Sequence, residues 1–279
     1  MATPRGHLNS HIFQRMKKAV SLGLDIGTSF CCAALARTVD GALQTEIVPS
    51  QLGSSHLTPS IVGFTGPNDS PLVGELARNK QTEVGNCAKT FYDFKRVIGR
   101  KYNDSQLYKI IGNWGFALSE STDPVRRQQE LPVYTVEAKN GLLREYTAFD
   151  LYSILARHLI DLAIARLAEN EQLTCITVTV PAHFNSEQRL NTKNSVIAAL
   201  AADTPVHILD EPVASVKAYT QQGRIDLTTF PPDKYIMVFD LGGGTLDVTI
   251  LRKDLHSQSL AVCSSEGFCD LGGTDFDRE

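Results

Sequence analysis

The sequence lacks the features of several protein classes. No apolar run approaches the about 20 residues that a membrane-spanning helix needs. The formal net charge of −4 gives no electrostatic reason to bind nucleic acid or an anionic membrane. Two phosphate-binding signatures are also missing, the P-loop GxxxxGK followed by Ser or Thr and the Rossmann GxGxxG. Neither of those folds is therefore expected to supply a nucleotide site.

Cysteine is scarce, and its spacing fits no metal site. None of the six cysteines forms a CxxC pair, and they make no dense disulfide framework. Several lie within apolar runs, so the sequence predicts buried, reduced thiols rather than metal ligands. The six are Cys31, Cys32, Cys87, Cys175, Cys263 and Cys269.

The N-terminus is basic and has no acidic residue before Asp25. It also has no apolar h-region, which argues against a secretory signal. Two interpretations remain, a flexible extension over residues 1–19 of a cytoplasmic protein and a mitochondrial presequence. We favour the first and expect a cytoplasmic location. The basic residues are Arg5, Arg15, Lys17 and Lys18.

The hydrophobic pattern predicts a mixed α/β chain. Helical periodicity is clearest over residues 149–167. Further helices are expected over residues 72–80, 90–98, 186–200 (with Ser186 as the N-cap) and 212–219. Strands are expected over residues 20–24, 30–36, 60–64, 175–180, 206–209, 235–239, 246–251 and 260–263. Loops are expected over residues 119–130 and 221–234.

Two segments about 216 residues apart resemble each other. Residues 20–37 (VSLGLDIGTSFCCAALAR) and 236–253 (IMVFDLGGGTLDVTILRK) share one arrangement. Each has an apolar strand, an aspartate, a glycine turn with a threonine, and a second apolar strand. The repeat predicts two related lobes that each present one hairpin turn.

The two turns are typical of a site for a metal-bound polyphosphate. Backbone N–H groups of a tight glycine turn form a nest for anions, and glycine lets a phosphate approach closely. Asp25 and Asp240 cannot favourably face phosphate, but they can hold Mg²⁺ or its water shell. One such turn alone fits an ordinary hairpin with a capping aspartate, whereas the matching pair favours the nucleotide site. The expected cradle consists of Gly27, Thr28, Ser29, Phe30, Gly242, Gly243, Gly244 and Thr245.

Six motifs follow one another as LDIGTSF, YDFKRVIGR, VTVPAHFN, LDEPVAS, FDLGGGTLDV and LGGTDFD. This series resembles the 70-kilodalton heat-shock (DnaK-type) chaperones from about Leu22 to the last residue. Actin and sugar kinases share the two turns, but YDFKRVIGR and VTVPAHFN favour the chaperone branch. The resemblance implies an α/β, actin-like ATPase fold with duplicated ribonuclease H-like lobes around a nucleotide cleft.

The resemblance also implies domain limits. Lobe I would span residues 20–224, with an inserted outer subdomain at about 54–147, and residues 225–279 would begin lobe II. The last motif, within Leu271–Glu279, lies well inside the family's ATPase fold. We therefore expect an incomplete second lobe, no substrate-binding domain, and a chain that binds ATP poorly.

The same resemblance assigns roles at the cleft. Lys95 matches the lysine that positions the attacking water and stabilises the transferring γ-phosphoryl group. The alternative is a solvated lysine in the basic patch of residues 95–101. Glu211 matches a glutamate that acts through the metal's water shell, and Thr245 and Asp247 match residues beside the attacking water.

Other matched residues lie further from the reacting atoms. Asp275 matches a carboxylate near the cleft, and Gly272 and Gly273 belong to the expected nucleotide site. Pro181 and Arg189 match a proline and an arginine that relay the nucleotide state to the partner domain. Their alternative is a strand-end proline and a helix-surface arginine.

The sequence departs from the family pattern at several positions. His183 stands where the family usually has tyrosine, and we expect a packing or hydrogen-bonding variant rather than a catalyst. Val213 replaces a common threonine, and Lys217 interrupts a usually small, apolar helix. The phosphate, lysine and metal positions are intact, which argues against a pseudo-ATPase.

The resemblance implies a chaperone whose ATP cycle drives polypeptide binding and release. It implies ATP or ADP with Mg²⁺ as cofactors, and K⁺ as a further candidate. The expected partners are unfolded polypeptide clients, J-domain co-chaperones and nucleotide exchange factors, with no nucleic acid or membrane, and the expected state is a monomer. The alternatives are a non-catalytic chaperone-like regulator or exchange factor, and a small-molecule kinase on the same fold.

Overall fold

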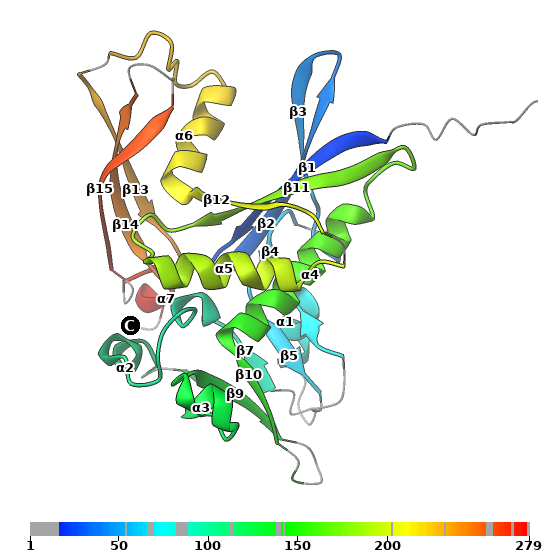
Figure 1. Ribbon diagram of the computed structural model, residues 1–279, viewed down its shortest axis with the longest axis vertical. Coiled ribbons are helices and arrows are strands. Elements are labelled where there is room, and N and C mark those ends of the chain that lie inside the picture. Colours follow the sequence, from blue (N-terminus) through cyan, green and yellow to red (C-terminus); the bar gives the residue numbers. More distant parts are fainter. Residues whose placement is uncertain are drawn as a thin grey trace, which may run out of the picture.

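The computed structural model describes residues 17–53, 55–65, 70–81, 89–111, 114–137, 141, 143–201, 203–231, 233–254, 259–268 and 271–277. Within these residues it contains a six-stranded sheet with the order β12-β11-β1-β2-β3, and β4 pairs with β2 (Figure 1). The basic segment before Lys17 lies outside the described residues. The six strands are β1 (Lys18–Ile26), β2 (Phe30–Val39), β3 (Ala42–Ile47), β4 (Thr58–Pro59), β11 (Glu171–Val180) and β12 (Val206–Asp210).

Strand direction brings residues from distant parts of the sequence to one edge of this sheet. β1 and β2 form an antiparallel hairpin, whereas β1, β11 and β12 run parallel to one another. The carboxyl ends of parallel strands meet at the same edge, where α/β proteins bind their ligands. Asp25, Pro181 and Glu211 all lie at this edge, at or just beyond a strand end.

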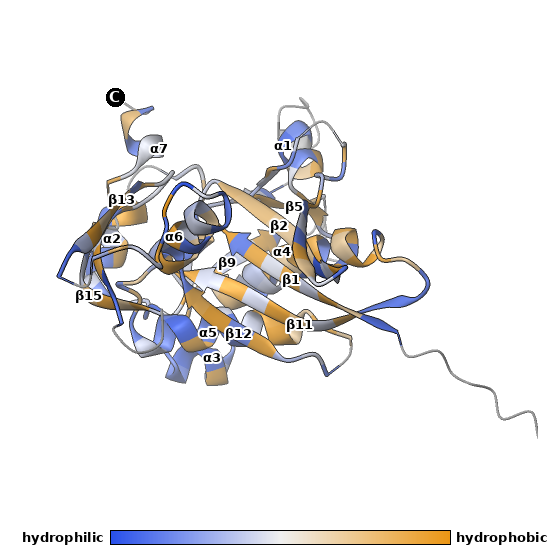
Figure 2. Ribbon diagram, turned by 90° about the horizontal axis from the view of Figure 1, so that it is seen from above, coloured by the Kyte–Doolittle hydropathy of each residue, from blue (hydrophilic) through white to orange (hydrophobic). Residues whose placement is uncertain are grey.

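Helices cover both faces of the sheet. α4 (Ala148–Ile164) and α5 (Ser186–Ala198) lie on one face, and α6 (Glu211–Gln221) lies on the other (Figure 1). Alternate residues of β1 and β11 are buried as a strand's period of two requires, and Figure 2 shows the hydrophobic colour along β11 and β12. The buried strand residues are Val20, Leu22, Leu24, Ile26, Ile176, Val178 and Val180.

A second, antiparallel sheet carries the second glycine turn. Its order is β13 (Tyr235–Leu241), β14 (Leu246–Lys253) and β15 (Leu260–Phe268). The two hairpins close in the same way: the N–H of Gly27 donates to the carbonyl of Phe30 at 3.1 Å, and that of Gly242 to Thr245 at 2.9 Å. The repeat seen in the sequence is thus also a repeat of backbone geometry.

Smaller elements complete the described fold. Three strands form the sheet β6-β5-β7 and three form β10-β9-β8. They are β5 (Val62–Phe64), β6 (Leu72–Val73), β7 (Lys89–Phe91), β8 (Leu118–Glu120), β9 (Pro132–Glu137) and β10 (Leu143–Thr147). The remaining helices are α1 (Glu75–Gln81), the 3₁₀ helix η1 (Phe94–Arg96), α2 (Ser105–Ile111), α3 (Pro124–Gln128) and α7 (Gly273–Phe276).

Three local predictions were wrong. The helix expected over residues 90–98 is instead β7 followed by η1, because Asp93 adopts a left-handed φ of 58° that no continuous helix allows. The loop expected over residues 119–130 contains α3, which Asp123 caps by accepting from two backbone N–H groups. α5 is capped by Asn185 rather than Ser186, in a reciprocal capping box with Gln188.

The cysteine prediction is correct only in part. Cys31 is buried, Cys32 and Cys175 are half-buried, and Cys263 is exposed. Cys263 differs because β15 lies at the edge of its sheet and most of its residues face solvent. The other two cysteines lie outside the described residues. Within the part of the chain that the structure describes, no helix has the length and apolarity to pass through a bilayer.

Candidate functional site

The first glycine turn is held by Thr179 on β11 and by Ser60, which follows β4. Thr179 on β11 donates to Asp25 Oδ1 at 2.9 Å, which fixes the carboxylate at the end of β1. Ser60 donates from its hydroxyl to the carbonyl of Gly27 at 2.7 Å and from its backbone N–H to that of Ser29 at 2.9 Å. Sequence reasoning missed Ser60, because a serine after a Thr-Pro turn carries no motif.

The second glycine turn is held by α7 and the residues before it. The N–H of Gly273 donates to the carbonyl of Gly242 at 2.8 Å, and that of Thr274 to Gly243 at 2.8 Å. A Cβ at Gly272 would lie 2.6 Å from the backbone of Gly244. Gly272 and Gly273 therefore lie against the backbone of the second turn, as its support.

The two turns pack directly against each other. A Cβ at Gly244 would lie 2.5 Å from Thr28 Cγ2 and would also collide with the Arg96 guanidinium. Gly243 lies against the side chain of Ser29. Arg96 completes the contact through an ion pair with Asp275 at 2.9 Å, and its side chain is only 1% exposed.

Lys95 lies beside the turns in a buried ion pair. Its Nζ is 2.7 Å from Glu211 Oε1, so η1 and the start of α6 meet here. Burial alone would lower the pKa of Lys95, but the Glu211 and Asp25 carboxylates outweigh it and raise that pKa. The alternative of a solvated basic patch is wrong for Lys95 and Arg96, which are both buried.

The carboxylates around Lys95 crowd one another. Burial raises the pKa of Glu211, and the Lys95 ammonium only partly opposes this while Asp25 and Asp240 add to it. Burial also raises the pKa of Asp240, and the neighbouring Asp247 raises it further. The single ammonium of Lys95 thus faces several carboxylates, and a bound divalent cation would reduce the repulsion among them.

The residues present fit a hydrated magnesium ion. Within the described residues, no three His, Cys, Asp or Glu side chains are close enough together to ligate a metal directly. Mg²⁺ keeps several of its waters and is usually held by one or two carboxylates together with substrate phosphates. Asp25, Asp240 and Glu211 are suited to hold such an ion through its water shell.

The site also fits an anion, although the turns leave little room. Ser29 Oγ and Arg96 Nε are buried and have no hydrogen-bond partner among the described residues. Buried polar groups are rarely left unpaired, so these two atoms indicate a missing acceptor. Residues including Thr28, Lys95 and Thr245 line a cavity of about 10 Å³, roughly the space of one water. A phosphate tail therefore requires the turns to move apart.

Thr245 and Asp247 lie on either side of the first residue of β14. Thr245 lines the small cavity, and Asp247 is buried and pairs in register with Asp240 across the hairpin. His183, which follows β11, makes a contact between its Nδ1 and Asp247 Oδ1. The sequence marked His183 as a departure but did not predict this partner, because the two residues are 64 positions apart.

Arg189 is more than a helix-surface arginine. It is only partly exposed, and its guanidinium pairs with Asp210 at 2.6 Å. It also donates to the carbonyls of Phe184 at 2.9 Å and Ala182 at 3.0 Å, in the segment that follows Pro181. These contacts tie the end of β11 to the end of β12, beside Glu211.

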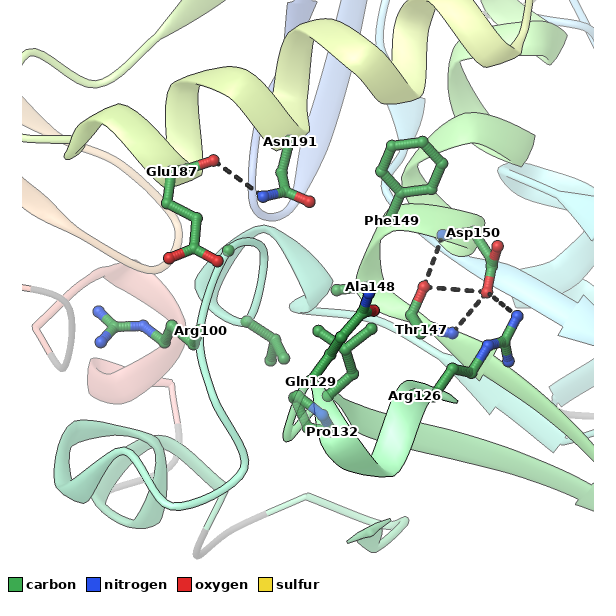
Figure 3. A pocket seen from close by; sticks show the side chains of 13 residues that line it. Arg100, Arg126, Gln129, Pro132, Thr147, Ala148, Phe149, Asp150, Glu187 and Asn191 are labelled. Carbon is green, nitrogen blue, oxygen red and sulfur yellow. Dashed lines mark hydrogen bonds and ion pairs between the residues drawn. The ribbon is translucent and has the colours of Figure 1, made fainter. Parts of the chain in front are cut away.

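A larger cavity of about 240 Å³ lies elsewhere, among α3 and the N-terminal ends of α4 and α5 (Figure 3). Several of its charged and polar groups already have partners. Arg126 pairs with Asp150 at 3.4 Å, and Thr147 and Asp150 form the capping box of α4. Arg100 pairs with Asp104 at 2.7 Å. This cavity is therefore a weaker candidate for the nucleotide than the glycine turns.

Comparison with known proteins gives a consistent result. A family model described as Hsp70 protein matches residues 21–279. Heat shock 70 kDa protein BIP3 of Oryza sativa subsp. japonica is 34% identical over 260 residues, which are 92% of this chain and 34% of that protein. A heat shock protein of the SSB type from Pyricularia oryzae is 30% identical over 259 residues, 92% of this chain and 38% of that protein. The chain spans about a third of the length of these relatives.

Proposed function

Since the chain belongs to the Hsp70 family and has its actin-like α/β ATPase fold, we propose that it binds ATP with Mg²⁺ between the two glycine turns and hydrolyses it. The family binds nucleotide together with Mg²⁺ and acts as an ATPase-type chaperone with client polypeptides and co-chaperones. Activity of this particular chain, an ATP affinity weaker than that of a complete two-lobed site, and K⁺ as an additional ion belong to the proposal.

One observation carries the proposal. The Lys95–Glu211 ion pair lies beside two glycine turns that come from different sheets and are closed by the same hydrogen bond. Asp25 and Asp240 each precede their turn by two residues. A purely structural ion pair would not require this repeated arrangement of carboxylates and backbone N–H groups around one ammonium.

The proposed roles follow from the chemistry of each group. The backbone N–H groups of Gly27 to Phe30 and of Gly242 to Thr245 would bind phosphate oxygens. When bound, Mg²⁺ would neutralise charge on the phosphates. Asp25, Asp240 and Glu211 would hold the ion's water shell, and Lys95 would place its positive charge against the transferring phosphoryl group.

Two residues around the start of β14 would act on the attacking water. Asp247 on β14 offers a carboxylate that can accept a proton of the water, and Thr245, just before β14, offers a hydroxyl at the small cavity. Both belong to the hairpin that carries the second glycine turn, so separation of the turns would move them together with that turn. Hydrolysis would thus be linked to the relative position of the two sheets.

The remaining proposals concern the whole protein. We propose that Pro181 and Arg189 transmit the nucleotide state to a substrate-binding domain, where unfolded polypeptides bind and are released. J-domain co-chaperones and nucleotide exchange factors are the proposed regulators, and the cytoplasm is the proposed location. The Arg189–Asp210 pair supports the relay, because it joins the ends of two strands beside Glu211.

The direct test is release of inorganic phosphate from MgATP by the purified protein without any added acceptor. Release that requires Mg²⁺ would support the ATPase. Tight nucleotide binding without turnover would favour the non-catalytic regulator, and transfer only to an added sugar would favour the kinase. Crowded carboxylates and an intact Lys95 favour the ATPase over the non-catalytic regulator. The motifs YDFKRVIGR and VTVPAHFN favour it over the kinase.

A further inference from the structure

His183 joins the two halves of the proposed site. It lies in the segment between β11 and α5, and its Nδ1 contacts Asp247 Oδ1 on β14 of the other sheet. The histidine side chain is 20% exposed and that of Asp247 is 7% exposed. The contact is therefore a largely buried link from the first sheet to the residue proposed to face the attacking water.

The neighbouring strand makes room for this link. Gly267 on β15 lies opposite Asp247 in the register of β14 and β15. A Cβ at Gly267 would lie 2.5 Å from His183 Nδ1 and 2.8 Å from Asp247 Oδ1. Any larger residue at this position would displace the pair, so β15 is shaped around the contact.

The chemistry of the pair fixes the direction of the hydrogen bond. An ionised carboxylate only accepts hydrogen bonds, so His183 must carry its proton on Nδ1. A donor on one carboxylate oxygen restricts the rotation of the aspartate side chain, and it leaves the other oxygen able to accept from water. The same arrangement holds catalytic groups in place in many enzymes.

We propose that His183 is a positioning residue for ATP hydrolysis, in which its Nδ1–H holds Asp247 so that the free carboxylate oxygen receives the attacking water. This inference rests on the ATPase proposed above. His183 touches neither nucleotide nor water in this role and acts only through Asp247.

Other charged groups near His183 are already paired. The small cavity that His183 lines is also lined by three basic residues. Lys95 pairs with Glu211, Arg96 with Asp275 and Arg100 with Asp104. The residue of β15 that lies against the His183 ring is Gly267, which has no side chain. Asp247 is thus the acceptor in direct contact with His183.

The test compares kcat and KM for MgATP in wild type, His183→Phe and His183→Tyr under the same conditions. His183→Phe removes the donor and should lower kcat by about 10- to 100-fold, the range for residues that orient a functional group, with KM changed less than about twofold. His183→Tyr keeps a donor and should recover most of kcat. Wild-type kcat in His183→Phe, or equal loss of kcat in His183→Phe and His183→Tyr, would overturn the inference.

A second measurement is independent of turnover and of misfolding in the Phe variant. The ¹⁵N chemical shifts of the His183 ring nitrogens, measured by NMR of ¹⁵N-labelled histidine and assigned with His183→Tyr, should change in Asp247→Ala, which removes the acceptor. Unchanged ¹⁵N shifts would reject the contact itself. Wild-type protein without hydrolysis would instead reject the proposed ATPase, so the two failures are distinguishable.

Discussion

Lys95 Nζ lies 2.7 Å from Glu211 Oε1, and the two residues are 116 positions apart in the sequence. Their side chains are only 9% and 16% exposed. Removing one member of a buried ion pair leaves the other charge without compensation and costs about 3–5 kcal/mol. The stability of this region therefore depends on Lys95, the same residue that the proposed reaction requires.

The first prediction concerns Lys95→Ala. Phosphate release should fall by about 100- to 1,000-fold, as when an enzyme loses one preorganised positive group. Nucleotide affinity should change much less, because the turns and carboxylates remain. Steady-state hydrolysis and calorimetric titration of MgADP measure the two effects. Lys101→Ala, whose side chain is 43% exposed, is the control and should leave both values unchanged. Unaltered hydrolysis in Lys95→Ala would contradict the role of this lysine.

The second prediction concerns the contact between the turns. Gly244→Ala places a methyl group 2.5 Å from Thr28 Cγ2 and against the Arg96 guanidinium. The turns should be forced apart, and the apo protein should lose about 1–3 kcal/mol of stability from overpacking. MgADP affinity should fall, because the added methyl group prevents the close phosphate approach that glycine allows. Urea denaturation and calorimetry test both effects. Gly115→Ala is the matched control, since its Cβ would meet only Tyr92 Oη at 4.0 Å. Equal behaviour of the two variants would refute the tight contact.

The glycine turns and their strands could be predicted because their signals are local. An apolar run that ends in Asp25 and Gly27 is sufficient to predict a strand and a turn, and the second copy at Asp240 strengthened the interpretation. The repeat also predicted that the turns belong together. These predictions rest on a pattern of strand, aspartate, glycine turn and strand within about 18 residues. Over such a short distance, neighbours in the sequence are also neighbours in space.

The remaining features depend on tertiary contacts. The helix expected over residues 90–98 fails at Asp93, whose left-handed backbone lets Lys95 and Arg96 turn inward. No periodicity predicts this, because the burial of two basic residues is stable only when Glu211 and Asp275 are present. The same reason explains why the partner of His183 could not be found in the sequence.

The third prediction concerns the proposed relay. Arg189→Lys loses the fork that binds Asp210 and the carbonyls of Ala182 and Phe184. Stability should fall by about 1–2 kcal/mol, and ATP should no longer accelerate peptide release from the full-length protein, while nucleotide affinity is kept. A fluorescent peptide reports the release. Arg157→Lys on α4, which is 47% exposed, controls for the loss of a guanidinium. Normal ATP-driven release in Arg189→Lys would remove this residue from the relay.

The fourth prediction separates binding from stability at Asp240. Burial and then Asp247 raise the pKa of this carboxyl group, so its ionised form is unfavourable in the folded protein without a cation. Asp240→Asn should therefore raise the urea midpoint of the metal-free protein. The same substitution should weaken Mg²⁺-dependent nucleotide binding by about tenfold or more. A residue that is costly without its ligand is typical of a binding site rather than of a core.

The sign of the pH dependence follows from the raised pKa of Asp240. Below the unfolded value of about 3.9, the carboxyl is protonated in both states and costs nothing. As the pH rises from there through the raised folded pKa, the unfolded state ionises first and the wild type loses stability relative to Asp240→Asn. The stability difference between the two proteins should thus be near zero in acid and largest above the folded pKa, and Mg²⁺ with ADP should reverse it. Asp233→Asn, whose side chain is 74% exposed, should show no such pH-dependent difference. Urea titrations at several pH values provide the measurement, and a variant that is less stable than wild type at neutral pH without Mg²⁺ would show that Asp240 stabilises the fold instead of holding a cation.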